Sequence, residues 1–188
     1  MLTLPAASTA LVLIDLQNGI VAMPTAPYSG AEVVTQCAAL AKRFREAGAP
    51  VIYVRVDLAN MIKLNVDRPS RDPNSPPPPA VASELTPEAG RQEGDLLITK
   101  RHWSAFPNTT LEAELRARGI NTIVIGGIAT NIGVESTARD AAGLGFDVVF
   151  AEDAMATVSA EAQQFALDVI FPRMGRVRKT SDIHVQRS

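Results

Sequence analysis

Short apolar runs alternate with segments of helical spacing along this chain. The runs predict strands at Thr9–Asp15, Val51–Asp57, Asp95–Thr99, Asn121–Gly127 and Phe146–Ala151, with a sixth, shorter one around Val177. Most of these runs contain few polar positions, as in strands that are buried on both faces of a parallel sheet.

The segments between the strands carry helix signals. Within residues 31–47, four apolar side chains recur at helical spacing, namely Val33, Cys37, Leu40 and Phe44. A capping-box pattern, Thr109-x-x-Glu112, predicts a helix from about Thr110 to Arg118. A further helix follows Asn131 and ends near Leu144.

The last predicted helix begins near Ser159, whose side chain is suited to capping a helix N-terminus. Its inward positions are expected to be Ala162, Phe165 and Val169, and Pro172 ends it.

Alternating strands and helices predict a three-layer α/β/α Rossmann-like fold around a mostly parallel six-stranded sheet. We expect residues 1–188 to form one domain. Residues 60–94 interrupt the pattern and contain seven of the 13 prolines. They are expected to form a loop that wraps its own domain, although Pro76–Pro79 would also suit recognition by an SH3-type module if exposed.

Composition narrows the function. The chain has 18 Lys and Arg against 20 Asp and Glu, so it lacks the basic excess of a nucleic-acid binder. No apolar run approaches the roughly 20 residues of a membrane helix, and residues 1–8 make a poor signal peptide. The one cysteine, Cys37, cannot form an internal disulfide, which fits the reducing cytoplasm. Neither His102 nor His184 fits a metal-binding spacing, so no metal is expected.

Candidate chemistry lies where strands end. Asp15 closes the first strand and Lys100 follows the third, while the turn Gly126–Gly133 leads from a strand into a helix N-terminus. Ligands bind beyond the carboxyl ends of strands in such sheets. Each feature alone also has a plain interpretation: a turn-forming Asp, a solvated Lys and a tight strand–helix connection.

Together these segments resemble the isochorismatase-like superfamily, which also contains cysteine hydrolases. The matching segments are Ala10–Asn18 (ALVLIDLQN), Thr99–Leu111 (TKRHWSAFPNTTL), Gly126–Ala141 (GGIATNIGVESTARDA) and Val148–Ala154 (VVFAEDA). The resemblance implies a hydrolase that acts on a small molecule. It also implies a homo-oligomer, either a dimer or a tetramer.

The resemblance places the family's catalytic Asp on Asp15 and its catalytic Lys on Lys100. The nucleophilic Cys would fall on Gly133, so a covalent Cys intermediate is not expected. Isochorismatases also carry Gly at this position and hydrolyse a vinyl ether. By analogy Asp15 donates a proton, and Lys100 orients substrate or water. A nearby Lys lowers the pKa of an Asp, whereas a proton donor needs a raised pKa, so burial has to outweigh Lys100.

The resemblance further implies a cis peptide between Ile128 and Ala129 that aims the N–H groups of Ala129 and Gly133 at a substrate oxygen. The substrate pocket would be completed by Gln17, Trp103, Phe106 and Asn131. Metal-binding relatives use Asp-x-His after the second strand, where this chain has Asp57-Leu58-Ala59. Neither metal nor cofactor is therefore expected.

Two alternatives stay open. Without the Cys nucleophile, the chain could be a catalytically silent relative that binds a small ligand or a protein partner. Ser104 or Ser136 could replace the nucleophile, although neither has an evident base beside it in the sequence.

Overall fold

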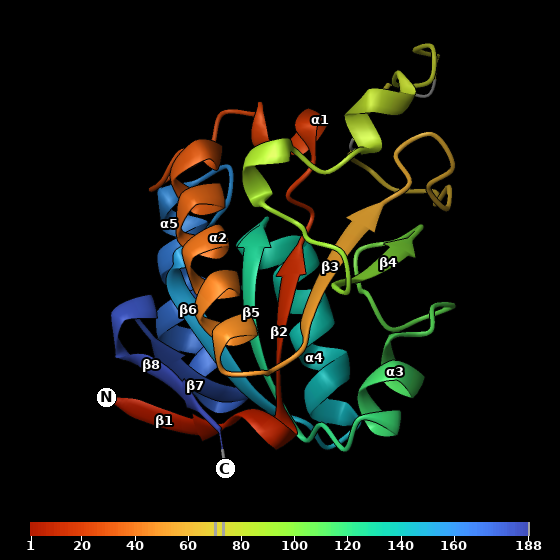
Figure 1. Cartoon of the computed structure of the whole chain (residues 1–188). Helices are drawn as coiled ribbons and strands as arrows, with labels where there is room; N and C mark the ends of the chain where they lie inside the picture. Colours follow the sequence, from red (N-terminus) through yellow and green to blue (C-terminus); the bar gives the residue numbers. More distant parts are fainter. Residues whose placement is uncertain (70, 73, 188) are drawn as a thin grey trace.

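A six-stranded parallel sheet forms the centre of the computed structural model, which describes residues 1–69, 71–72 and 74–187 (Figure 1). Its strands are β2 (Thr9–Ile14), β3 (Val51–Val56), β4 (Leu96–Lys100), β5 (Thr122–Ile128), β6 (Asp147–Ala156) and β7 (Gly175–Arg178). They lie in the order β4-β3-β2-β5-β6-β7. Every neighbouring pair is parallel. This confirms the predicted α/β class and the six-stranded sheet.

Helices cover both faces of the sheet. The α-helices are α1 (Asn18–Val21), which lies beyond the strand ends, and α2 (Gly30–Glu46), α3 (Leu111–Ala117), α4 (Glu135–Gly143) and α5 (Ala160–Phe165). Helix α2 packs on one face, and α3 and α4 pack on the other (Figure 1). Two π-helical turns, Thr130–Val134 and Ala166–Ile170, lie before α4 and after α5. The predicted three layers are therefore confirmed.

Strand β2 shows why its run is apolar at every position. Leu11 and Leu13 pack into the cluster under α2, whereas Val12 and Ile14 pack into the cluster on the opposite face. Successive side chains of a strand point to opposite faces, so a strand with helices on both sides buries all of them. All four side chains are fully buried.

The order of the strands reverses beside β2. From β2 the chain moves outward through β3 to β4, then returns to pair β5 on the other side of β2. Such a switch point leaves a crevice at the carboxyl ends of the two strands, because their connections leave in opposite directions. Asp15 directly follows β2, and the turn before α4 follows β5.

Two strands and one α-helix, α1, were not predicted from the sequence. Strand β1 (Leu2–Pro5) pairs in parallel with β8 (Ile183–Gln186), so the two ends of the chain lie side by side (Figure 1). Strand β6 continues beyond the predicted end at Ala151 as far as Ala156. The polar pair Glu152 and Asp153 had hidden this extension, because it breaks the apolar run.

Helix ends correct two further predictions. The proposed Thr109–Glu112 capping box is wrong: α3 has Thr110 at its N-cap, without a side-chain capping bond. Thr109 Oγ1 instead donates to the carbonyl of Ala105. A complete capping box does start α2, where Ser29 and Glu32 bond reciprocally.

Ser159 caps α5 as predicted, because its side chain accepts from the Ala162 amide. Phe165, however, is 58% exposed and does not face the core. Gln163 and Ala166 are the buried positions of this region.

The second half of the proline-rich loop packs on the domain, as predicted. Leu85 forms an antiparallel bridge with Gln17, and the Tyr53 hydroxyl donates to the Ala89 carbonyl. Ser70 and Pro73, within the predicted 60–94 loop, and Ser188 lie outside the described residues. The loop is thus anchored beside the carboxyl end of β2 at Gln17.

Candidate active site

Lys100 reaches Asp15 across an intervening strand. Lys100 is the last residue of β4, and β3 lies between β4 and β2. Strands two places apart are separated by about 10 Å, which suits one extended Lys side chain meeting a short carboxylate. The Lys100 ammonium lies 2.7 Å from Asp15 Oδ2 and 3.1 Å from the carbonyl oxygen of His102.

The Asp15–Lys100 pair is buried. Asp15 is 5% exposed and Lys100 is 2% exposed. A buried ion pair is costly to desolvate unless its remaining polar atoms are hydrogen-bonded. Asp15 Oδ1 is buried and has no partner among the described residues. The carboxylate therefore keeps an unused acceptor at the switch point, which a structural ion pair would normally satisfy.

Burial raises the pKa of Asp15 to about 6, whereas the charge of Lys100, its hydrogen bond and the nearby backbone amide of Val56 lower it by less. This resolves the opposition identified from the sequence: desolvation of the carboxylate outweighs the attraction of the ammonium. A carboxyl group with such a pKa can donate or accept a proton near neutral pH.

The backbone also singles out Asp15. Its φ is +53°, in the left-handed region that few residues other than Gly adopt. Asp tolerates this conformation better than most side chains, and here it turns the chain sharply at the end of β2. The Asp15 amide donates to the Val54 carbonyl, and the Asp15 carbonyl accepts from the Gln17 amide. These bonds fix the carboxylate relative to β3.

Gly133 lies against the same pair. A Cβ atom at this position would be 3.2 Å from Asp15 Oδ2, 3.6 Å from the Lys100 ammonium and 3.0 Å from the Ile14 Cγ2 methyl. The structure thus brings together the three positions that the sequence identified as candidates. A side chain at position 133 would fill the space beside the carboxylate.

The turn between β5 and α4 begins with a cis peptide between Ile128 and Ala129, as predicted. Gly127 has φ +119°, and a Cβ there would be 2.1 Å from the Ile14 carbonyl oxygen, so only Gly fits beside β2. The chain then forms the π-helical turn Thr130–Val134.

The other predicted pocket residues are distributed differently. Asn131 is exposed, and its Oδ1 accepts from the Thr157 hydroxyl at 2.6 Å. Trp103 is 49% exposed and lies beside the His102 ring. Phe106 is 8% exposed and packs on Phe146 in the core under α3 and α4.

Gln17 is fully buried, and both the nitrogen and the oxygen of its side-chain amide are hydrogen-bonded. Its Nε2 donates to the carbonyls of Val56 and Ser83, and its Oε1 accepts from the Val56 amide. Gln17 thus joins the end of β3 to the proline-rich loop, next to Asp15.

Several polar residues that hold this edge together were missed from the sequence. Thr137 donates to the Gly133 carbonyl, and Gln163 accepts from the Thr130 hydroxyl. Thr157 holds Asn131 in the same turn. In sequence these residues look like ordinary helix or loop positions, because their partners lie elsewhere in the chain. The sequence signal that could have indicated such a role was the hydroxyl of Thr137 within residues 133–141 (GVESTARDA).

The alternative nucleophiles and the Asp57 site have their own contacts. Ser104 Oγ accepts from the Phe106 amide, and Ser136 lies on α4 beyond Gly133. Asp57 accepts from the amide and side chain of Asn60, which lower its pKa. Within the described residues, no group of three His, Cys, Asp or Glu is arranged to hold a metal ion.

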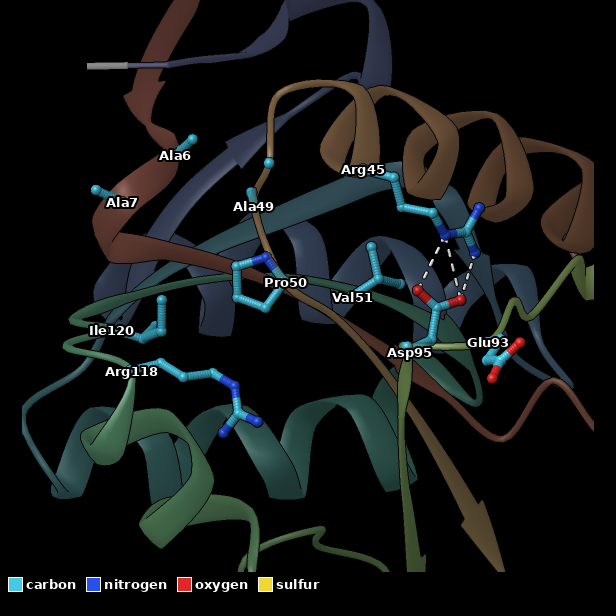
Figure 2. Close-up of a pocket in the computed structure, with 12 residues that line it drawn as sticks. Ala6, Ala7, Arg45, Ala49, Pro50, Val51, Glu93, Asp95, Arg118 and Ile120 are labelled. Carbon is cyan, nitrogen blue, oxygen red and sulfur yellow. Dashed lines mark hydrogen bonds and ion pairs between the residues drawn. The ribbon is translucent and has the colours of Figure 1, made fainter.

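A cavity of about 500 Å³ opens at the opposite end of the strands, near the residues where β3 and β4 begin (Figure 2). Arg45, Asp95, Arg118 and Glu93 line it together with backbone near Gly48. The Arg45 guanidinium and the Asp95 carboxylate face each other there and are hydrogen-bonded (Figure 2).

In the part of the chain that the structure describes, no helix is long and apolar enough to cross a membrane. The buried Asp15–Lys100 pair lies at the switch point of the parallel sheet, which is where α/β sheets of this kind bind their ligands.

Comparison with known proteins identifies the family. Residues 9–182 match the isochorismatase domain. The chain is 47% identical to the isochorismatase family protein YecD of Escherichia coli O157:H7, over 97% of this chain and 98% of that protein. It is 33% identical to the ureidoacrylate amidohydrolase RutB of Variovorax paradoxus, over 88% of this chain and 75% of that protein.

Among solved structures, an isochorismatase family protein from Burkholderia thailandensis matches with a TM-score of 0.88 and 46% identity, covering 94% of both chains. The chain therefore belongs to the isochorismatase family. The family predicted from the sequence motifs is confirmed, as is the hydrolase class at the level of that family.

Proposed function

We propose that this chain hydrolyses a small molecule by acid–base chemistry at Asp15, with Lys100 as its partner and without a covalent Cys intermediate. One observation carries the proposal: Asp15 is buried against Lys100, keeps one unpaired oxygen, and faces a position that has no side chain. A reactive carboxyl group needs a free oxygen that can reach a substrate atom.

The chemistry follows from the position of the proton. With its pKa near 6, Asp15 is protonated in a minor fraction of molecules at neutral pH. In that form it can protonate an oxygen or carbon of the substrate, and the Lys100 ammonium stabilises the carboxylate that remains. Water then adds to the activated carbon, the bond to the leaving group breaks, and the proton that the water releases returns to Asp15. The residues of the protein supply this chemistry, so the proposal requires no metal or cofactor.

A thiol route has no suitable group. Cys37 lies on α2, is fully buried, and donates to the carbonyl of Ala154. Burial raises the pKa of its thiol, and the charge of Asp153 raises it further. A buried, protonated thiol is a poor nucleophile.

We assign substrate binding to the turn after β5. Ile128 and Ala129 precede the π-helical turn beside Gly133, and their backbone is the candidate cradle for a substrate oxygen. Asn131 and Trp103 have exposed surface that a substrate can contact. Phe106 shapes the pocket from within the core, and Gln17 positions Asp15 through its bonds to β3.

The substrate class is tested by turnover. We would assay the wild-type chain on vinyl ethers, ureido and simple amides, and esters, beside Asp15→Asn. RutB is a ureidoacrylate amidohydrolase, which makes ureido compounds a reasonable part of the panel. Turnover by the wild type that is lost in Asp15→Asn supports the proposal. Undiminished turnover by Asp15→Asn contradicts it.

Gly133→Cys sharpens the test. The new Cβ would be tight against Ile14 and 3.2 Å from Asp15 Oδ2, so the Ile14 methyl must shift by a few tenths of an ångström. We expect the added thiol to react with iodoacetamide, whereas Cys37 in the wild type stays unlabelled. New amidase activity in this variant would show that the site retains the geometry of a cysteine hydrolase.

The alternative function is ligand binding without turnover. The observation that favours it is Gly at position 133, where the nucleophile of a cysteine hydrolase would lie, whereas the presence of both Asp15 and Lys100 counts against it. Tight binding of a metabolite, with no turnover across the whole panel, would select this alternative.

Three further predictions accompany the proposal: one domain over residues 1–188, a homodimer or homotetramer, and residence in the cytoplasm. Analytical ultracentrifugation tests the oligomeric state.

A further inference from the structure

We propose that Thr137 is a positioning residue that couples the turn before α4 to the segment after Lys100, and thereby sets the geometry of the Asp15–Lys100 pair. This inference rests on the proposed function of that pair. It arises from a single buried hydroxyl that joins two segments distant in sequence.

Thr137 lies one helical turn beyond Gly133 and is fully buried. Its Oγ1 lies 2.7 Å from the Gly133 carbonyl oxygen and 3.1 Å from the Ala105 amide nitrogen. The polarity of both bonds is fixed, because an amide can only donate and a carbonyl can only accept. The hydroxyl therefore accepts from Ala105 and donates to Gly133, and no side chain without a hydroxyl of this shape can do both.

The segment that receives this bond also holds Lys100. Ala105 lies five residues after Lys100, and the carbonyl of His102 between them accepts from the Lys100 ammonium. This segment is therefore fixed at His102 by Lys100 and at Ala105 by Thr137. Arg101, between Lys100 and His102, is held by the Ile62 amide, so the Thr137 bond is the restraint on the Ala105 side of His102. If the bond at Ala105 is lost, we expect the His102 carbonyl, one of the two acceptors of the Lys100 ammonium, to shift.

The other end of the bridge is equally close to the reactive groups. The backbone of Gly133 faces Asp15 and Lys100, as the Cβ distances at this position show. Thr137 thus acts on both sides of the pair without touching either member. A misplacement of about 1 Å in such a site can lower turnover by roughly 100-fold.

The test compares Thr137→Val, which keeps the shape and removes the hydroxyl, with Thr137→Ser, which restores it. Thr180→Val is the matched control, because Thr180 is also buried and its hydroxyl donates to Asp153 on β6 instead of to the Gly133 turn. The primary readout is the titration of the Asp15 carboxyl carbon by ¹³C NMR, which needs no substrate. Thermal unfolding of each variant is measured in parallel.

In Thr137→Val we expect the Asp15 midpoint to fall by at least half a pH unit, because a displaced segment admits water to the carboxylate. Thr137→Ser should titrate like the wild type, and Thr180→Val should lose stability without moving the midpoint. With a substrate from the panel above, Thr137→Val should lower kcat roughly 10- to 100-fold with KM within about threefold.

An Asp15 midpoint and a kcat in Thr137→Val that match the wild type, with only the unfolding temperature changed, would overturn the inference. That outcome differs from failure of the proposed function. If Asp15 is not the reactive group, Asp15→Asn keeps its turnover whatever the Asp15 titration shows in Thr137→Val.

Discussion

Two carboxylate–cation pairs lie at opposite ends of the strands of the same sheet, and both involve β4. Asp95 precedes this strand and pairs with Arg45, while Lys100 closes it and pairs with Asp15. In each pair the closest nitrogen–oxygen distance is 2.7 Å. The distance therefore does not distinguish them, although the Arg45 side chain is 20% exposed and the Lys100 side chain is 2% exposed.

The hydrogen bonds of the two carboxylates distinguish the pairs. Both oxygens of Asp95 accept from the Arg45 guanidinium, and Oδ2 also accepts from the Gln92 amide. In Asp15, only Oδ2 has a hydrogen-bond partner among the described residues. A fully bonded pair holds the fold together, whereas a partly bonded pair keeps an atom available for a substrate. The open cavity of about 500 Å³ lies at the fully bonded pair, so the size of a cavity does not mark the chemistry here.

The largest expected difference between the pairs is in turnover. Replacing Asp15 by Asn removes the proposed proton donor and should lower kcat/KM by about 1,000-fold or more. Replacing Asp95 by Asn should leave kcat/KM within about threefold, because Asp95 lies at the opposite end of the strands. Steady-state kinetics on a panel substrate measure both. Equal losses of kcat/KM in the two variants would show that the two ion pairs do not differ in their importance for turnover.

The pairs should also differ in how pH affects stability. Folding raises the pKa of Asp15 from 3.8 to about 6, so between these values the folded state binds more protons than the unfolded state. Stability from this group is therefore greatest below pH 4, falls as pH rises to about 6, and is constant above that. Relative to Asp15→Asn, the wild type should lose up to roughly 3 kcal/mol across this range.

Urea unfolding of the wild type and Asp15→Asn at half-unit steps from pH 4 to pH 7 measures this difference. If the stability gap between the two proteins stays constant across the series, burial does not raise the pKa of Asp15.

Removal of the Asp95 carboxylate should mainly destabilise the protein. Asp95→Ala leaves the Arg45 guanidinium without its bidentate partner, and the loop around Gln92 loses an acceptor. We expect unfolding to cost about 2–3 kcal/mol less than in the wild type. Urea unfolding at pH 7 tests this, and a change below half of that value would show that the pair is not structural.

The smallest effect concerns the other unpaired polar atom of β2. Thr9 Oγ1, at the start of the strand, is buried and lacks a hydrogen-bond partner within the described residues, as Asp15 Oδ1 does at the end. If Thr9 has no chemical role, Thr9→Val should stabilise the fold by about 0.5–1 kcal/mol and leave turnover unchanged. Thermal unfolding and kinetics test both. Destabilisation would mean that the hydroxyl is satisfied in solution.

The local pattern of apolar and polar residues was enough to predict the central sheet. Strands buried on both faces are continuous apolar runs, and the polar residues at their ends meet at one edge of a parallel sheet, as Asp15 and Lys100 do. The β1–β8 pair could not be predicted in the same way, because two four-residue strands at opposite ends of the chain carry no local signal of their pairing.

The polar residues that hold the candidate site in place could not be predicted for a related reason. Thr137 and Gln163 are polar residues on or beside helices, and in sequence they are indistinguishable from solvent-facing ones. Their burial depends on contacts with Ala105 and Thr130, which only the three-dimensional fold reveals. Phe165 shows the opposite error, an apolar residue at helical spacing that faces solvent.

The proposed activity depends on the Asp15 carboxyl group, which burial beside the Lys100 ammonium group would keep available as a proton donor near neutral pH. The most direct measurement is a ¹³C NMR titration of the Asp15 carboxyl carbon in the wild-type chain, assigned with Asp15→Asn. We predict a midpoint at about 6. A midpoint near the ordinary aspartate value of about 4 would contradict the account.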